Sequence, residues 1–89
     1  MGLFSRISLS ANKVYTLYYN PRRVFLMIMN DTESIVYISE DPVNIELNGI
    51  PIYPFEVLVF DRGDGDKVEG PYYLFCKNDV SIRVYEGVV

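Results

Sequence analysis

The stretch that decides the fold is residues 79–89, Asp79-Val80-Ser81-Ile82-Arg83-Val84-Tyr85-Glu86-Gly87-Val88-Val89. Val80, Ile82 and Val84 alternate with the residues between them, and a period of two places alternate side chains on opposite faces of a β-strand. The pattern therefore predicts a strand held in a sheet, with these three aliphatic side chains directed into a core.

Segments of the same kind recur upstream, separated by the asparagine, proline and glycine residues that form turns. The expected strands are residues 14–19, 24–29, 35–38, 43–47, 55–60, 72–76 and 80–85, with 3–9 as an edge strand or arm and 50–54 as a proline-broken edge or crossing. Asn48-Gly49 is a strong two-residue hairpin signal, and residues 77–79 are expected to turn the last two strands into a hairpin. No segment predicts a convincing helix.

The sequence thus predicts an all-β fold, an antiparallel β-sandwich or jelly roll of seven to eight strands. Residues 1–12 are expected to form an N-terminal arm or edge strand, and residues 13–89 a single β-sandwich domain. A chain of 89 residues is near the small end of what one hydrophobic core stabilises alone.

The apolar content is high for so thin a sandwich. Apolar residues make up 49% of the chain, with eight tyrosines and five phenylalanines, more than two layers can hide. Val24–Met29 is six apolar residues without a polar break, so one face of that strand needs a second cover. The residue 3–9 arm could fold over it and leave a monomer, but the surplus of aromatic residues favours an oligomer.

Several function classes are disfavoured by composition. The net charge of −4 and the lack of a basic run argue against nucleic acid. No apolar stretch reaches the roughly 18 residues that span a membrane. Cys76 is the one cysteine and there is no histidine, so we expect no disulfide framework and no cysteine metal site. No cofactor is expected.

The glycine- and acid-rich segment 61–66, Asp61-Arg62-Gly63-Asp64-Gly65-Asp66, allows two interpretations. Its alternating carboxylates could surround Ca²⁺, but the EF-hand spacing fails because Gly63 occupies a ligand position. The sequence favours a solvated hairpin tip. Arg62-Gly63-Asp64 also matches an integrin-recognition tripeptide, a string short enough to occur by chance.

No set of side chains predicts catalysis. The close carboxylate pairs, Glu40-Asp41 and Asp64-Asp66, lie in expected exposed turns rather than in a pocket that would separate their pKa values. Cys76 and Ser81 have no histidine to activate them. The tyrosine pairs 18–19 and 72–73 could form a sugar-stacking platform, although aromatic residues at this density more often pack in cores and interfaces.

From Tyr19 to Glu86 the chain resembles a family of small tailed-phage virion proteins, β-sandwich accessory modules of heads and tails. The shared order is Asn20-Pro21-Arg22-Arg23, an apolar strand ending in Asn30, Val36-Tyr37-Ile38, Asn48-Gly49-Ile50-Pro51-Ile52, Pro54-Phe55-Glu56, Tyr72-Tyr73-Leu74-Phe75 and Ile82-Arg83-Val84-Tyr85-Glu86. Phe55 stands where the family usually has glycine, and Cys76 and Lys77 replace its usual small residues.

The resemblance implies a non-enzymatic viral structural protein, a capsid-decorating, head-fibre or tail-associated subunit located in the virion. Its expected partners are further copies of itself, as a trimer or larger ring, and virion proteins such as the major capsid protein. The candidate interface residues are Arg23, Phe25, Met27, Met29, Tyr72 and Tyr73. A carbohydrate-binding module of a viral fibre is the alternative, and a small hydrolase-like enzyme is a third class.

Overall fold

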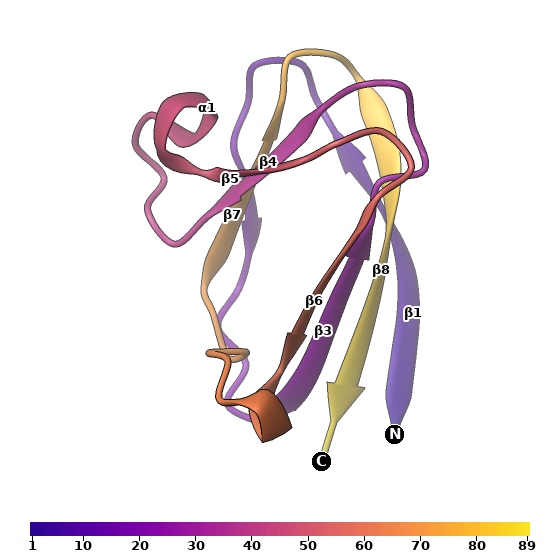
Figure 1. Cartoon of the computed structure of the whole chain (residues 1–89), viewed down its shortest axis with the longest axis vertical. Helices are drawn as coiled ribbons and strands as arrows, with labels where there is room; N and C mark the ends of the chain where they lie inside the picture. Colours follow the sequence, from indigo (N-terminus) through magenta and orange to yellow (C-terminus); the bar gives the residue numbers. More distant parts are fainter.

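The computed structural model describes residues 1–89 as two packed four-stranded antiparallel sheets (Figure 1). The strands are β1 (Gly2–Leu9), β2 (Tyr15–Leu17), β3 (Arg23–Met29), β4 (Val36–Ser39), β5 (Ile50–Ile52), β6 (Val57–Asp61), β7 (Tyr72–Cys76) and β8 (Val80–Val88). Two short helices complete the chain, α1 (Ile45–Asn48) and the 3₁₀ turn η1 (Arg62–Asp64). None of the helices has the length and apolarity needed to cross a membrane.

The strand order identifies a jelly roll. The first sheet has the order β1-β8-β3-β6, and the second has the order β2-β7-β4-β5. The chain passes between the sheets at most connections, so strands adjacent in sequence seldom pair, and the first and last strands lie side by side. The predicted fold class, including the number of strands, is confirmed.

The core lies between the two sheets. Its fully buried members are Leu26, Ile28, Val36, Ile38, Leu74, Ile82 and Cys76, together with Val68 from the loop before β7. Val80, Ile82 and Val84 face this core from β8, as the period of two at the end of the sequence predicted. The alternation is reliable because each strand has only one face covered by the opposing sheet.

Two predicted local structures are wrong. Residues 43–47 form no strand; residues 45–47 belong to the four-residue helix α1, which Asn44 precedes as its N-cap. Asn48-Gly49 is not a hairpin turn, because Gly49 is extended with φ −81°. The glycine is needed for close packing instead, since a Cβ there would lie 2.6 Å from the carbonyl oxygen of Ile45 and 2.8 Å from that of Ile38.

The last two strands do not form a hairpin. β7 pairs with β2 and β4 in the second sheet, whereas β8 pairs with β1 and β3 in the first. Residues 77–79 therefore cross from one sheet to the other. The turn signal in the sequence was correct, but a turn residue does not specify whether the strands on either side of it share a sheet.

Candidate functional site

The surface of the first sheet that faces away from the core is rich in apolar side chains. Strand registers place its residues in three rows of four, each running across β1, β8, β3 and β6. The rows are Gly2-Gly87-Phe25-Asp61, Phe4-Tyr85-Met27-Val59 and Arg6-Arg83-Met29-Val57. We call these twelve residues the outer face.

The middle row is the most apolar part of the outer face. Phe4 is 83% exposed and Val59 is 45% exposed, while Tyr85 and Met27 between them are half-buried. The rings of Phe4 and Tyr85 have centroids 4.5 Å apart, and Phe25 meets Tyr85 edge-on at 5.8 Å. The three rings cover one another only in part, so a large apolar surface remains exposed to water.

Two glycines, Gly2 and Gly87, leave room for aromatic rings in the row next to the middle row. A Cβ at Gly2 would overlap the Tyr85 ring, and one at Gly87 would lie 3.0 Å from the Cβ of Phe25. Because neither glycine has a side chain, the Tyr85 and Phe25 rings can lie down on the sheet. The outer face is consequently flatter than its aromatic content alone would make it.

A charged cluster occupies one end of the outer face. Asp31, just beyond β3, accepts a hydrogen bond from Arg6 Nη2 at 3.1 Å and lies 3.0 Å from Arg83 Nε, both at the same oxygen, Oδ2. Its other oxygen, Oδ1, is buried without a hydrogen-bond partner. The Arg6 hydrogen bond is the main cause that holds the pKa of Asp31 below its ordinary value of 3.8. Two guanidinium groups thus share one carboxylate, so these three side chains together carry a net charge of about +1.

The six predicted interface residues separate into three groups. Phe25, Met27 and Met29 lie together on the outer face, on the side of β3 that the sequence predicted would need a second cover. That side is half-buried rather than fully buried. The 3–9 segment does not cover it, because β1 extends the sheet at its edge, beside β8.

Arg23 and Tyr72, two of the predicted interface residues, are interior residues of the subunit. Arg23 is 2% exposed and Tyr72 is 4% exposed. Tyr73 alternates with Tyr72 and points out from the second sheet, so this pair forms no shared stacking platform. Sequence reasoning also missed Phe4, Tyr85, Val57 and Val59, which join the outer face only through strand pairing.

Arg23 is the centre of a buried polar network. Its Nε donates to Glu86 Oε1 at 2.8 Å, and its Nη2 lies 2.6 Å from the same oxygen. Nη1 donates to the carbonyl oxygens of Val68 and Glu69 at 3.1 and 3.2 Å, and Nη2 donates to that of Tyr18 at 3.1 Å. One side chain therefore ties β8 to two loops of the other sheet.

Asn30 is the centre of a second buried hydrogen-bond network, at the other end of β3. Its Nδ2 donates to the carbonyl oxygens of Ser34 and Ile52 at 2.7 and 2.8 Å, while its Oδ1 accepts from the backbone N–H and the hydroxyl of Thr32. The side chain is completely buried. The amide therefore hydrogen-bonds both the loop that follows β3 and strand β5, and Asn30 connects the first sheet to the second.

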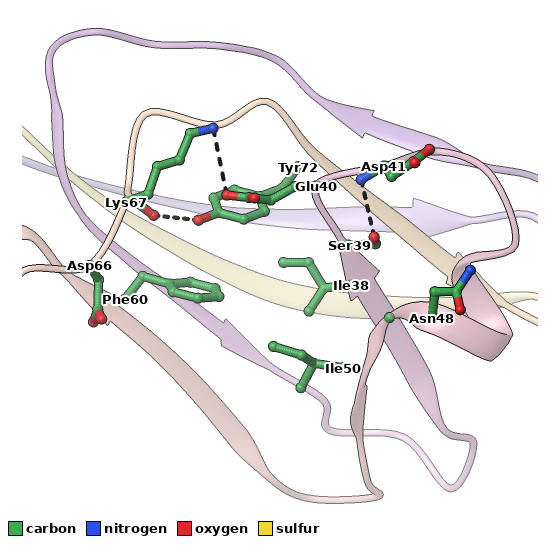
Figure 2. A pocket seen from close by; sticks show the side chains of 11 residues that line it. Ile38, Ser39, Glu40, Asp41, Asn48, Ile50, Phe60, Asp66, Lys67 and Tyr72 are labelled. Carbon is green, nitrogen blue, oxygen red and sulfur yellow. Dashed lines mark hydrogen bonds and ion pairs between the residues drawn. The ribbon is translucent and has the colours of Figure 1, made fainter.

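A pocket of about 540 Å³ lies between the edge strands β5 and β6 (Figure 2). Ile38, Ile50, Phe60 and Tyr72 form its apolar wall, and the Phe60 and Tyr72 rings are stacked with centroids 5.0 Å apart. Its remaining lining residues are Ser39, Glu40, Asp41, Asn48, Gly49, Asp66 and Lys67.

The polar groups of this pocket are partly engaged with one another. Lys67 Nζ lies 3.5 Å from Glu40 Oε1, and the Tyr72 hydroxyl donates to the Lys67 carbonyl oxygen. Burial is the main cause that raises the pKa of Tyr72 above 10.0, and the nearby charges of Glu40 and Asp66 add to it. The phenol therefore stays protonated at neutral pH and acts as a hydrogen-bond donor.

The acidic segment 61–66 and Cys76, which also stand out in the sequence, lie apart from one another. Asp61 caps the 3₁₀ turn η1 by accepting from the Gly63 N–H at 2.9 Å, and Asp66 Oδ2 accepts from the Asp61 N–H at 3.0 Å. The carboxylates of Asp61 and Asp66 thus bind the segment's own backbone. No group of three or more His, Cys, Asp or Glu side chains is placed to hold a metal ion. Cys76 is buried.

Comparison with known proteins supports the fold and no more. No protein-family model matches the chain, and no curated protein matches it. Among solved structures, an RmlC-like cupin protein from Desulfovibrio desulfuricans is similar, with a TM-score of 0.54 and 15% sequence identity. The match covers 94% of this chain and 71% of the cupin chain. At this identity the similarity shows a shared jelly-roll architecture.

Proposed function

We propose that this protein is a non-enzymatic structural subunit that acts through protein–protein contacts made by its outer face. The observation that carries the proposal is the exposed apolar surface on β1, β8, β3 and β6, with Phe4 at its centre row 83% exposed. Leaving several large apolar side chains in water forgoes about 1.5–3 kcal/mol each. For a small domain with about 5–15 kcal/mol of total stability, covering that surface is a large gain.

The resemblance of residues 19–86 to tailed-phage accessory proteins supports a place in a virion, as a capsid-decorating, head-fibre or tail-associated subunit. The jelly-roll fold is compatible with that role, since such sandwiches form viral capsid domains among many others. Under this proposal the partners are further copies of the chain and other virion proteins, with the major capsid protein the first to examine.

Replacing Val59 with glutamate should abolish assembly while leaving the fold intact. Val59 is 45% exposed on β6, so the charge stays hydrated in the free protein but would be buried unpaired in an assembly. We expect incorporation into purified particles to fall by at least about tenfold, measured by mass spectrometry as copy number relative to the major capsid protein.

Leu47→Glu is the matched control, because Leu47 is 81% exposed on α1, away from the outer face. It adds the same charge at another exposed apolar position and should be incorporated like the unmodified protein. Equal incorporation of both variants, or absence of the unmodified protein from particles, would refute the proposed role of the outer face.

The pocket between β5 and β6 favours a second candidate function, a carbohydrate-binding module of a viral fibre. It combines the partly exposed Phe60 ring, which stacks on the buried Tyr72 ring, with the carboxylates of Glu40 and Asp66 and the amide of Asn48. Aromatic rings provide apolar surface for a sugar ring, while carboxylates and amides can accept and donate hydrogen bonds to its hydroxyls.

A glycan array decides this second candidate. If the pocket binds a sugar, the unmodified protein should give reproducible hits. The binding signal of Asp66→Ala on the same glycans should be lower by about tenfold or more, because a bound hydroxyl would lose its hydrogen-bond acceptor. Asp64→Ala is the control, since Asp64 lies outside the pocket lining two residues away. Hits that persist in Asp66→Ala would place any sugar site elsewhere.

A further inference from the structure

The outer face is close to square. Its rows cross four strands spaced about 4.8 Å apart, and successive rows lie two residues, or about 6.7 Å, apart along the strands. Both dimensions are therefore about 14 Å between backbone positions. A square face can be laid on a copy of itself with the two sets of strands at right angles, and near-orthogonal crossing is one of the two common ways in which sheets pack.

Opposite charges occupy diagonally opposite corners of this square. Arg6 stands at the corner on β1, in the row that also holds Arg83, and its guanidinium reaches across β8 to Ser81 and Asp31. Asp61 stands at the corner on β6, in the opposite end row. The basic corner keeps a net positive charge because its two arginines share only Asp31. The residues at the other two corners, Gly2 and Val57, have no charged side chain.

We propose that a second copy of this chain covers the outer face, related by a two-fold axis that runs along the diagonal from Gly2 to Val57. This axis exchanges the charged corners, so Arg6 of each copy lies over Asp61 of the other. The apolar middle rows cross at the centre and cover Phe4 and Met27. The inference rests on the proposed function, in which the outer face is a protein contact, and it identifies the partner as an identical subunit.

The arrangement is isologous, meaning that each copy contributes the same surface, as in most soluble dimers. Side chains at the rim widen the face to about 20 Å, so each copy covers on the order of 400 Å², about 800 Å² in total, which is the size of a weak or transient interface. We therefore expect a dimer that dissociates on dilution through the micromolar range, with association that weakens as salt screens the two corner pairs.

A mixing experiment tests this arrangement. Asp61→Arg gives a copy with two basic corners, and Arg6→Glu gives a copy with two acidic corners. In sedimentation at the micromolar concentration where the unmodified protein dimerises, each variant alone should associate at least about tenfold more weakly, because both corner pairs become repulsive. An equimolar mixture should recover the dimer, since each basic corner then meets an acidic one.

Folding controls keep the result interpretable. Circular dichroism should give both variants the spectrum of the unmodified protein. Should Asp61→Arg fail to fold through loss of its cap on Gly63, Asp61→Asn keeps the acceptor oxygen while removing the charge. Asp61→Asn should associate more weakly than the unmodified protein and lose most of the salt dependence.

Strand pairing at the free edge of β1 is the competing arrangement, and it has a separate signature. Met1 and Val88 exchange hydrogen bonds in both directions, so the even-numbered residues of β1, including Ser8, direct their backbone groups away from β8. Ser8→Pro would block that edge without removing a bond to β8. Dissociation by Ser8→Pro alone, with the corner variants still dimeric, would overturn the face-to-face dimer.

Two further outcomes would also overturn the inference. One is a folded pair of corner variants that stays monomeric on mixing, and the other is an unmodified protein that is monomeric throughout the micromolar range. The proposed function fails separately, when Val59→Glu is incorporated into particles as well as Leu47→Glu. A monomer in solution whose incorporation still depends on Val59 would therefore leave the proposed function standing with a different partner.

Discussion

Replacing Arg23 with alanine is expected to lower the free energy of unfolding by about 3–5 kcal/mol. Arg23 is 2% exposed, and its guanidinium binds Glu86 and three backbone carbonyl oxygens. Truncation leaves the Glu86 carboxylate without its counter-charge and the carbonyls of Tyr18, Val68 and Glu69 without this donor. Against a total of about 5–15 kcal/mol, such a loss brings the domain close to unfolding.

Urea denaturation followed by circular dichroism measures the effect, and the neighbouring arginine provides the control. Arg22 is exposed and donates only through Nε to the carbonyl oxygen of Val89, so Arg22→Ala should change the stability by no more than about 0.5 kcal/mol. If the two alanine variants unfolded at the same urea concentration, the network around Arg23 would have no net stabilising role.

Replacing Asn30 with aspartate should destabilise the domain by about 2–4 kcal/mol at neutral pH. The Nδ2 group donates two hydrogen bonds, to Ser34 and Ile52. An aspartate oxygen in its place would face those two carbonyl oxygens with no proton to donate, inside a site from which water is excluded. The near-identical size of the two side chains means that packing is unchanged, so the measured loss reports the hydrogen bonds.

Asn78→Asp is the matched control for this substitution. Asn78 is exposed and its Nδ2 donates to the Ser34 hydroxyl at 3.0 Å, so the same chemical change occurs where water can replace the lost bond. Its effect should be within about 0.5 kcal/mol. Equal melting temperatures for the Asn30 and Asn78 variants would contradict the connecting role assigned to Asn30.

Period-two alternation was a sound guide to strands and to their inward faces. Ile82 and Val84 face the core as predicted, because the direction of a side chain in a strand depends only on local backbone geometry. The same reasoning correctly identified Phe25, Met27 and Met29 as a set that the core does not cover. A continuous apolar run in a two-layer fold leaves one of its faces outside, and the run is visible in the sequence.

Local chemistry was a poorer guide where packing competed with it. Asn48-Gly49 carries a strong turn signal, yet Gly49 is extended because the carbonyl oxygens of Ile38 and Ile45 approach it too closely for a side chain. Arg23 looked like a surface residue because arginine usually is one. Only the convergence of Glu86, the distant loop at residues 68–69 and the nearby carbonyl of Tyr18 supplies enough partners to bury it.

The sequence by itself determined the class of fold, the approximate strands, the absence of histidine and the apolar excess, because each of these depends on composition or on neighbours along the chain. Tertiary structure alone decided which strands pair, and therefore everything built from several strands. Phe4, Tyr85, Met27 and Val59 form one row although they are as much as 81 residues apart. The jelly-roll crossovers bring them together, since hydrogen bonding between strands is indifferent to sequence separation and the alternation within each strand does not reveal its neighbour.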